Sequence, residues 1–399
     1  MRPSRAARAE AQLILLSAGT RARRESTREI AETLLPDVRW EQLAATLRQR
    51  RLLALLGPRI SEVAGARGDA GFRSATELAA QSAHRAGRFM EMLSGELTSA
   101  LAETGIPASV LKGTALASSI HGDPGARVCN DIDLLVAAEN LQPAVSAIRG
   151  FGYRAPTDPL DRHGLPRLHL ALRHVHDRLP PVELHWRIHW YERNFARERL
   201  LVPRVDDRHA WRPAAGAELA GLLLFYARDG FIDLRLAVDL AAWWDRHGAA
   251  LEPCALAELA DAYPALGPVL WSAARAAERT VGLPAAQITA SMNRGGLRGR
   301  AAARLANPNP NPSSSASQLY AEAGMVDWLL TPRGQVTALI RRQLLPSRAV
   351  LDHRAQRPPE RQSRSWLLYG GRLVARSGVL GRYALGAVHL FGRRGAPSL

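Results

Sequence analysis

The sequence is poor in lysine and cysteine, and it has no long hydrophobic run. Lys112 is the only lysine among 53 lysine and arginine residues, so arginine carries nearly all of the net charge of +16. The two cysteines, Cys129 and Cys254, make no disulfide framework and fit a reducing compartment. No run reaches the roughly 18 apolar residues of a membrane span. The apolar stretch 13–16 is too short for the core of a signal peptide, and we therefore expect a cytoplasmic protein.

Acidic residues are absent from the C-terminal end of the chain, where none follows Glu360. We call residues 319–399 the basic tail, because arginine is its main charged residue. These arginines lie among aromatic and aliphatic residues. A basic excess favours polyanionic partners such as nucleotides, nucleic acid or an anionic membrane. Five glycines between Gly370 and Gly386 weaken any amphipathic helix there. Membrane contact, nucleic-acid contact, an acidic partner and packing on the rest of the chain all stay open for the tail.

Residues 1–105 are expected to form an N-terminal helical region. Two capping boxes, one starting at Ser26 and one at Ser74, each precede an apolar residue. The second opens a long amphipathic stretch, which is expected to end at Gly105 because glycine is the usual residue after a helix.

Beyond Gly105 the pattern changes to short strands and helices. This order predicts an α+β fold with a small mixed-sheet core at residues 106–212. A helical domain rich in alanine and leucine follows at 213–304, and Asn-Pro repeats with a serine run make 305–318 a linker. The predicted strands are 108–111, 132–136 and 182–186, the predicted helices are 114–120 and 141–148, and a turn is predicted at 122–125.

Two carboxylates stand two residues apart in the apolar run that begins at Asn130. A strand turns positions i and i+2 to the same face, so Asp131 and Asp133 are expected to project together. Adjacent carboxylates repel each other unless a cation lies between them, and their oxygens suit Mg²⁺ or Mn²⁺. The pair therefore predicts a divalent metal site, with solvated surface charge as the plainer reading.

Glu183 is the predicted third carboxylate. Metal-assisted nucleotidyl transfer uses two cations about 3.5–4 Å apart, which need several oxygen ligands. Val182 and Leu184 flank Glu183 as core residues would, which indicates a strand that can lie beside the first pair. Glu183 could bind the catalytic metal and orient or deprotonate an acceptor hydroxyl. An ion pair with an arginine is the alternative.

The segment around Gly113 is the predicted phosphate site. Glycine lets backbone amides approach a phosphate closely, and the helix that follows adds its positive end. Thr114 offers a hydroxyl donor, and Lys112 or Arg127 could neutralise phosphate charge. Arg127 is equally able to pair with Asp131. These residues predict a nucleoside triphosphate (NTP) as the ligand.

Together, these motifs resemble the uncharacterised bacterial nucleotidyltransferase family of the polymerase-β-like superfamily. The resemblance covers roughly residues 30–285. It rests on segments 111–117, 125–127, 131–136 and 182–186, with further similarity at 37–40, 150–153 and 236–240.

The resemblance implies a nucleotide-binding core with helical flanks, dependence on Mg²⁺, an NTP donor and an unknown small-molecule or peptide acceptor. Members are often associated with natural-product or surface-polymer biosynthesis. One departure concerns the glycine motif, which in the superfamily commonly reads Gly-Ser or Gly-Gly about a dozen residues before the first aspartate. Here it reads Gly113-Thr114, and seventeen residues separate Gly113 from Asp131.

Three other readings stay open. Six histidines lie from His163 to His189, and the pairs His174–His176 and His185–His189 allow a zinc site, although their spacing matches no closed zinc module. A pI of 11.1 favours template-free nucleotide addition to RNA, but no RNA-binding motif is present. A non-catalytic nucleotide-binding scaffold would use the same residues without turnover.

Overall fold

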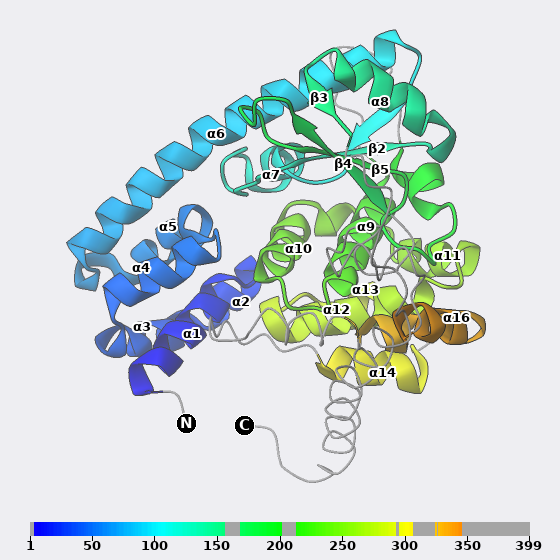
Figure 1. The fold of residues 1–399 in the computed structure, drawn as a ribbon. Coiled ribbons are helices and arrows are strands. Elements are labelled where there is room, and N and C mark those ends of the chain that lie inside the picture. The colour runs from blue at the N-terminus through cyan, green and yellow to red at the C-terminus, as the bar shows by residue number, and fades with distance from the viewer. Residues whose placement is uncertain are drawn as a thin grey trace, which may run out of the picture.

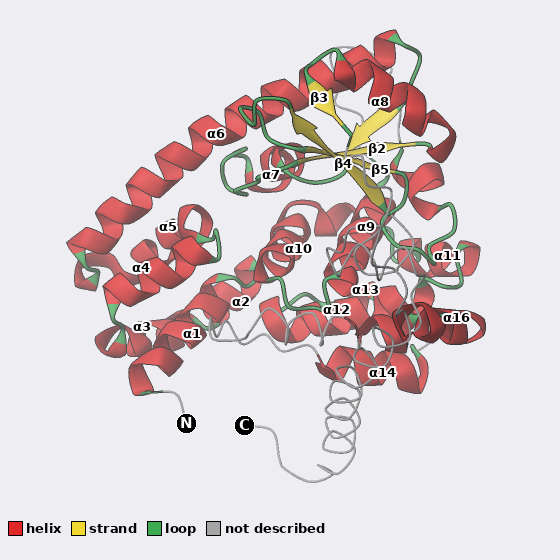
Figure 2. Ribbon diagram, in the orientation of Figure 1, coloured by secondary structure: helices red, strands yellow, loops and turns green. Residues whose placement is uncertain are grey.

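The computed structural model describes residues 4–155, 168–201, 213–292, 295–305, 324 and 326–344. The predicted linker, apart from residue 305, most of the basic tail and His163 lie outside the described residues. The described chain has an α+β fold in which helices surround one five-stranded mixed sheet (Figures 1 and 2). Within the described ranges, no helix is long and apolar enough to cross a membrane.

The N-terminal part is helical, as predicted. Its longest helix, α6, runs along the outside of the molecule from the N-terminal helices to the sheet (Figure 1). The helices are α1 (Arg5–Ser17), α2 (Arg21–Ser26), α3 (Arg28–Leu34), α4 (Trp40–Gln49), α5 (Leu53–Ala64) and α6 (Ala70–Glu103), with short turns η1 (Leu35–Asp37) and η2 (Gly65–Arg67).

Both predicted capping boxes were wrong, whereas the predicted end of the long helix is confirmed. Helix α3 follows Thr27 instead of Ser26, whose hydroxyl donates to the carbonyl of Arg23. Helix α6 starts after Asp69, whose carboxylate accepts a hydrogen bond from the Phe72 amide at 2.7 Å. The aspartate satisfies a free amide at the start of α6, as a serine cap would. The helix therefore begins before Ser74, which lies inside it.

The sheet has the order β1-β2-β5-β4-β3. Only β2 and β5 are parallel, and the other neighbours are antiparallel. All three predicted strands are confirmed, whereas β3 and β4 were not predicted. The strands are β1 (Ala108–Val110), β2 (Ile132–Val136), β3 (Tyr153–Arg154), β4 (His169–His174) and β5 (Val182–His185); the helices between them are α7 (Thr114–His121) and α8 (Leu141–Arg149), with η3 (Ala138–Asn140).

One face of the sheet packs on α6 and α8. The alternating apolar residues of β2 and β5 point to this side, where Leu134, Val182 and Leu184 are fully buried. Leu97 and Leu101 of α6 lie in the same hydrophobic cluster. Burial of this face fixes the strand register, because a shift by one residue would turn the apolar side chains outward.

A second hydrophobic cluster joins the C-terminal helices to α1–α5.

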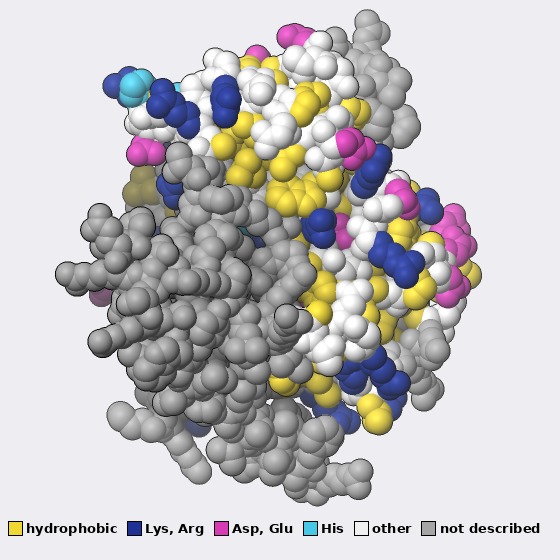
Figure 3. Space-filling model, turned by 45° about the vertical axis from the view of Figure 1, so that its right-hand side comes forward, with side chains coloured by type: hydrophobic (Ala, Val, Ile, Leu, Met, Phe, Trp, Pro, Cys, Tyr) yellow, Lys and Arg dark blue, Asp and Glu magenta, His cyan; other side chains and the backbone are white. Residues whose placement is uncertain are grey.

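On the face in Figure 3, the visible described residues carry basic side chains in separate groups with acidic ones among them, and not in one basic stripe. The remaining elements are η4 (Ala196–Leu200), α9 (Ala215–Arg228), α10 (Leu234–His247), η5 (Gly248–Ala250), α11 (Ala255–Ala262), α12 (Gly267–Val281), α13 (Ala285–Ile288), α14 (Gly296–Leu305) and α16 (Arg333–Leu344).

Candidate active site

Two of the three predicted carboxylates lie side by side on the sheet face opposite α6. Asp133 of β2 and Glu183 of β5 are register partners in the parallel pair, so their side chains leave the sheet on the same face. Asp133 is only 1% exposed, whereas the Glu183 side chain is 22% exposed. The structure therefore brings these two residues together.

Asp133 is held as an anion by two neighbours. His185 Nε2 lies 2.9 Å and Lys112 Nζ 3.2 Å from its Oδ1 atom. Burial alone would raise the pKa of the Asp133 carboxyl, but these two contacts outweigh burial and hold the pKa below its ordinary value. The second oxygen, Oδ2, is buried and has no hydrogen-bond partner among the residues that the structure describes. A buried carboxylate oxygen without a donor is costly, which is consistent with a position prepared for a cation.

Asp131 precedes β2 and adds a third negative charge. Its carboxylate makes no hydrogen bond or ion pair with any residue that the structure describes. Burial raises the pKa of Asp131, the nearby Asp133 and Glu183 carboxylates raise it further, and Lys112 offsets only part of this effect. Three carboxylates around one lysine leave a negative charge that a divalent cation would neutralise.

Two histidines complete this polar face. From the sequence, His185 was considered only as a zinc ligand together with His189, and His169 was not singled out. His169 of β4 faces His185 across the antiparallel pair, with ring centroids 4.8 Å apart. Glu183 lies between them, 3.6 Å from His169 Nε2 and 3.3 Å from His185 Nε2. One ligand atom of each of these three residues lies within 4.8 Å of the others, a spacing that suits a metal ion.

His169 is suited to bind a cation because burial lowers its pKa to about 4, which leaves the imidazole neutral at neutral pH. Of the histidines considered for zinc, only His185 belongs to this group of described residues. His174 and His176 lie outside this group, and His189 Nε2 contacts Asp327 at 2.8 Å. The signal for His169 was the alternation of β4, in which Leu170 and Leu172 point to the opposite face.

The predicted phosphate segment lies beside the carboxylates. The Leu111 amide donates to the Asp133 carbonyl at 3.1 Å, which holds this segment next to β2. Gly113 has φ +84°, a conformation that favours glycine, and it stands at the N-terminus of α7. No side chain caps this helix, so its first amides face the site without a side-chain acceptor. Thr114 is the first residue of α7 and is buried.

Lys112 connects the carboxylates to α9. Its ammonium lies over the ring of Phe225, 5.2 Å from the centroid, and also binds Asp133. A lysine fits this position because its compact charge can face a carboxylate and an aromatic ring together.

Arg127 binds a different partner from the two considered. Its Nε atom contacts Asp239 Oδ2 of α10 at 2.7 Å, and His121 Nε2 contacts the other oxygen at 3.2 Å. Burial would raise the pKa of Asp239, but Arg127 and His121 lower it. The Arg127 side chain is only 8% exposed. This buried ion pair ties α10 to the loop that carries Asp131.

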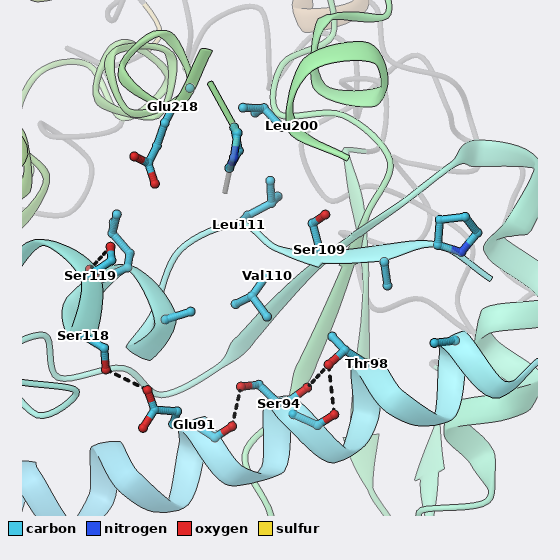
Figure 4. Close-up of a pocket in the computed structure, with 18 of the residues that line it drawn as sticks. Glu91, Ser94, Thr98, Ser109, Val110, Leu111, Ser118, Ser119, Leu200 and Glu218 are labelled. Atoms are coloured by element: carbon cyan, nitrogen blue, oxygen red, sulfur yellow. Dashed lines mark hydrogen bonds between the residues drawn. The ribbon is translucent and has the colours of Figure 1, made fainter. Parts of the chain in front are cut away.

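A pocket of about 690 Å³ opens at the β1 edge of the sheet, and none of the three carboxylates lines it. It lies between α6, β1, α7 and α9, and Figure 4 shows Glu91, Ser94 and Thr98 on one side of Val110 and Leu111, with Glu218 and Leu200 on the other. Its volume is typical of small-molecule sites, and its walls are mainly apolar with several hydroxyl groups. Phe225 lines the pocket, and its ring also lies 5.2 Å from the ammonium of Lys112, which binds Asp133. Phe225 is therefore the residue that the pocket shares with the surroundings of the carboxylates.

Comparisons with known proteins place this geometry in a family. Searches of the curated proteins and of the solved structures each found no match to the chain. A family described as "uncharacterised nucleotidyltransferase" matches residues 36–281, which include Gly113, the three carboxylates and the Arg127–Asp239 ion pair. Because this match covers more than half of the sequence, the chain belongs to the uncharacterised nucleotidyltransferase family.

Proposed function

We propose that the protein transfers a nucleoside monophosphate from an NTP to a small-molecule or peptide acceptor and releases pyrophosphate. The observation that supports this most strongly is the pairing of Asp133 with Glu183 on parallel strands, with Asp131 beside them and Asp133 Oδ2 buried without a partner. Family membership supports nucleotidyl transfer in general.

Asp131, Asp133 and Glu183 would hold the divalent cations. The residues present fit such ions, because their oxygens are hard ligands and two of the carboxylates lack full compensation. A bound ion would supply positive charge to the phosphates and to the attacking group. Both Mg²⁺ and Mn²⁺ fit the oxygens, and the neutral nitrogen of His169 beside Glu183 favours Mn²⁺.

The uncapped amides after Gly113 and the ammonium of Lys112 would bind the phosphates, with Thr114 at the start of the same helix. Arg127 would act through its charge and its hold on the Asp131 loop, because Asp239 already occupies its guanidinium. Glu183 would accept the proton of the acceptor. The acceptor atom bonds to the α-phosphorus as the bond to the bridging oxygen breaks, and pyrophosphate leaves.

The pocket in Figure 4 would hold the acceptor. Its volume and mainly apolar walls fit a small molecule or a short peptide side chain better than an RNA strand. The separate basic groups in Figure 3 also give no continuous track for a nucleic-acid backbone on the described part of that face.

The test is transfer of radiolabel from α-phosphate-labelled NTPs to a panel of metabolites and peptides. Wild-type protein is expected to label one acceptor class in the presence of Mg²⁺ or Mn²⁺, and Asp133→Ala protein is expected to label none. Equal labelling by the folded variant would remove the carboxylates from the mechanism. Metal-dependent NTP binding without transfer to any acceptor would instead favour the scaffold reading.

A further inference from the structure

A second, smaller pocket lies where the N-terminal helices meet the C-terminal helices. Residues 49–52 and 232–235 line it, and its volume is about 280 Å³. These two loops lead into α5 and α10, helices of 12 and 14 residues, so the N-termini of both lie at the pocket. The first amides of α5 have no side-chain cap among the described residues and favour an anion. At α10 the Asp233 carboxylate already accepts from the Arg235 amide, and the C-terminal end of α4 adjoins the pocket at Gln49.

The charged side chains of this pocket are unbalanced. Arg50, Arg51 and Arg235 line it, together with a single acid, Asp233. Asp233 is occupied by Arg235, whose Nε and Nη2 atoms lie 3.2 and 2.8 Å from its oxygens. Neither Arg50 nor Arg51 forms a salt bridge with a residue that the structure describes, and the Nε atom of Arg50 is buried without an acceptor. Arg50 interacts electrostatically with Asp233, but Arg235 already binds that carboxylate, so one acid is shared among three arginines.

Arg51 has a backbone conformation that favours glycine. Its φ is +58°, and it directly follows the C-terminal end of α4, where the Leu52 amide donates to the Leu47 carbonyl at 2.8 Å. Glycine is the usual residue at this position of a helix C-terminus because it avoids the steric strain of a side chain. An arginine at this position costs stability relative to glycine, but it supplies a guanidinium group that glycine could not.

Arg51 connects the pocket to the loop before β2, because it contacts Asn130. With its amide oxygen turned toward Arg51, the Asn130 side chain accepts hydrogen bonds from both terminal guanidinium nitrogens, at 3.1 and 2.6 Å. Asn130 immediately precedes Asp131. The loop between α9 and α10 makes a second connection, because Asp229 in that loop interacts electrostatically with both Lys112 and Arg235.

We propose that this pocket binds the terminal phosphates of the NTP, with Arg50 and Arg51 as direct ligands. The inference rests on the proposed function only in taking an NTP as the donor. A triphosphate carries several negative charges, and Arg127 is already paired, so Lys112 and the amides of α7 would otherwise neutralise it alone. Guanidinium groups bind phosphate oxygens through charge-assisted, often bidentate hydrogen bonds. The N-terminal helical region would thus contribute directly to nucleotide binding.

Arg51→Gly protein tests this proposal, because the substitution removes the guanidinium and also relieves the backbone strain. We expect affinity for inorganic tripolyphosphate and for NTPs to fall about tenfold or more in calorimetric titrations, while affinity for a nucleoside monophosphate stays unchanged. The melting temperature should stay equal or rise. A purely structural arginine would lower stability and affinity together. Unchanged tripolyphosphate affinity, or no tripolyphosphate binding by wild-type protein, would overturn the proposal.

Arg193→Gly is the matched control, because Arg193 is exposed and has the same φ of +58° at a different place in the chain. It removes an equal charge and is expected to leave affinity unchanged. Asp131→Ala/Asp133→Ala protein separates the two hypotheses, since it should keep metal-free tripolyphosphate binding. Tripolyphosphate binding that Arg51→Gly weakens, without any nucleotidyl transfer, would retain the subsite and reject the proposed function. If Arg51→Gly protein keeps both nucleotidyl transfer and NTP affinity, the proposed function is retained and the phosphate subsite is rejected.

Discussion

Strands β2 and β5 bury both faces of the sheet, but the two faces differ in how completely their buried groups are satisfied. Leu134 and Leu184 on one face belong to an apolar cluster with residues of α6 and α8, and no described residue of that cluster has a buried side-chain nitrogen or oxygen without a partner. On the other face, Asp133 Oδ2 and the Nδ1 atoms of His169 and His185 are buried without hydrogen bonds. Unsatisfied buried groups cost stability. We infer that the first face holds the fold together, and that the second is kept for binding.

The largest effect is expected from Asp133→Asn, which changes the binding face alone. The substitution keeps the shape of the side chain but removes the charge that faces Lys112 and His185. Label transfer should fall by on the order of 10³-fold, because the amide is a poor metal ligand. The circular dichroism spectrum should stay that of a folded protein. Activity within a few-fold of wild type would contradict the assignment of this face.

Leu184→Ala changes the opposite face of β5. It removes a fully buried side chain from the α6 and α8 cluster, so the free energy of unfolding should fall by about 3 kcal/mol. NTP affinity of the remaining folded protein should stay close to wild type. Urea denaturation measures the free energy of unfolding, and calorimetry measures the NTP affinity. A loss of NTP affinity without a loss of stability would show that the two faces are not separable.

Glu192 offers a contrast to Asp133 among the buried carboxylates. It is 1% exposed, and burial raises its pKa from 4.5 to about 7, although the amides of Ile188 and His189 donate to it. The folded state therefore holds this proton more tightly than the unfolded state. The contribution of Glu192 to stability should be greatest below about pH 4.5 and fall by roughly 3 kcal/mol as the pH rises through 7. Denaturation of Glu192→Gln protein should lack this decline, and an unchanged pH profile in the variant would exclude Glu192 as its source.

The smallest effect concerns the choice of metal. His169→Gln removes a neutral nitrogen next to Glu183 while keeping a polar, partly exposed side chain. Affinity for Mn²⁺ should fall about tenfold, and affinity for Mg²⁺ should change little. His174→Gln, at the other end of β4, is the control and should alter neither value. Equal losses for both metals in His169→Gln protein would argue that the histidine only supports the position of Glu183.

Local patterns were sufficient to predict the centre of the fold. The bounds of β2 match the prediction, and β1, α7, α8 and β5 match within one residue, because alternation and glycine breaks are strong there. Strand β4 was missed although Leu170 and Leu172 alternate with His169 and Ala171. This alternation places His169 on the polar face of the sheet, beside Glu183.

Contacts between distant residues could not be predicted from local sequence. Arg127 and Asp239 are 112 positions apart, and their pairing depends on how α10 packs against the loop before β2. Arg51 belongs to a helical region whose sequence carries no nucleotide-binding motif, and only the fold brings it to Asn130. The spacing of Asp131, Asp133 and Glu183 predicted a shared face, whereas the histidines and arginines around that face depend on tertiary packing.

Calorimetric titration of the four common NTPs into wild-type and Asp131→Ala/Asp133→Ala protein, with and without Mg²⁺ or Mn²⁺, tests the binding face most directly, because it needs no acceptor. The account predicts metal-dependent binding of at least one NTP to the wild type and loss of that binding in a folded double variant. Equal, metal-independent binding to both proteins would contradict the claim that these carboxylates form the metal–nucleotide site.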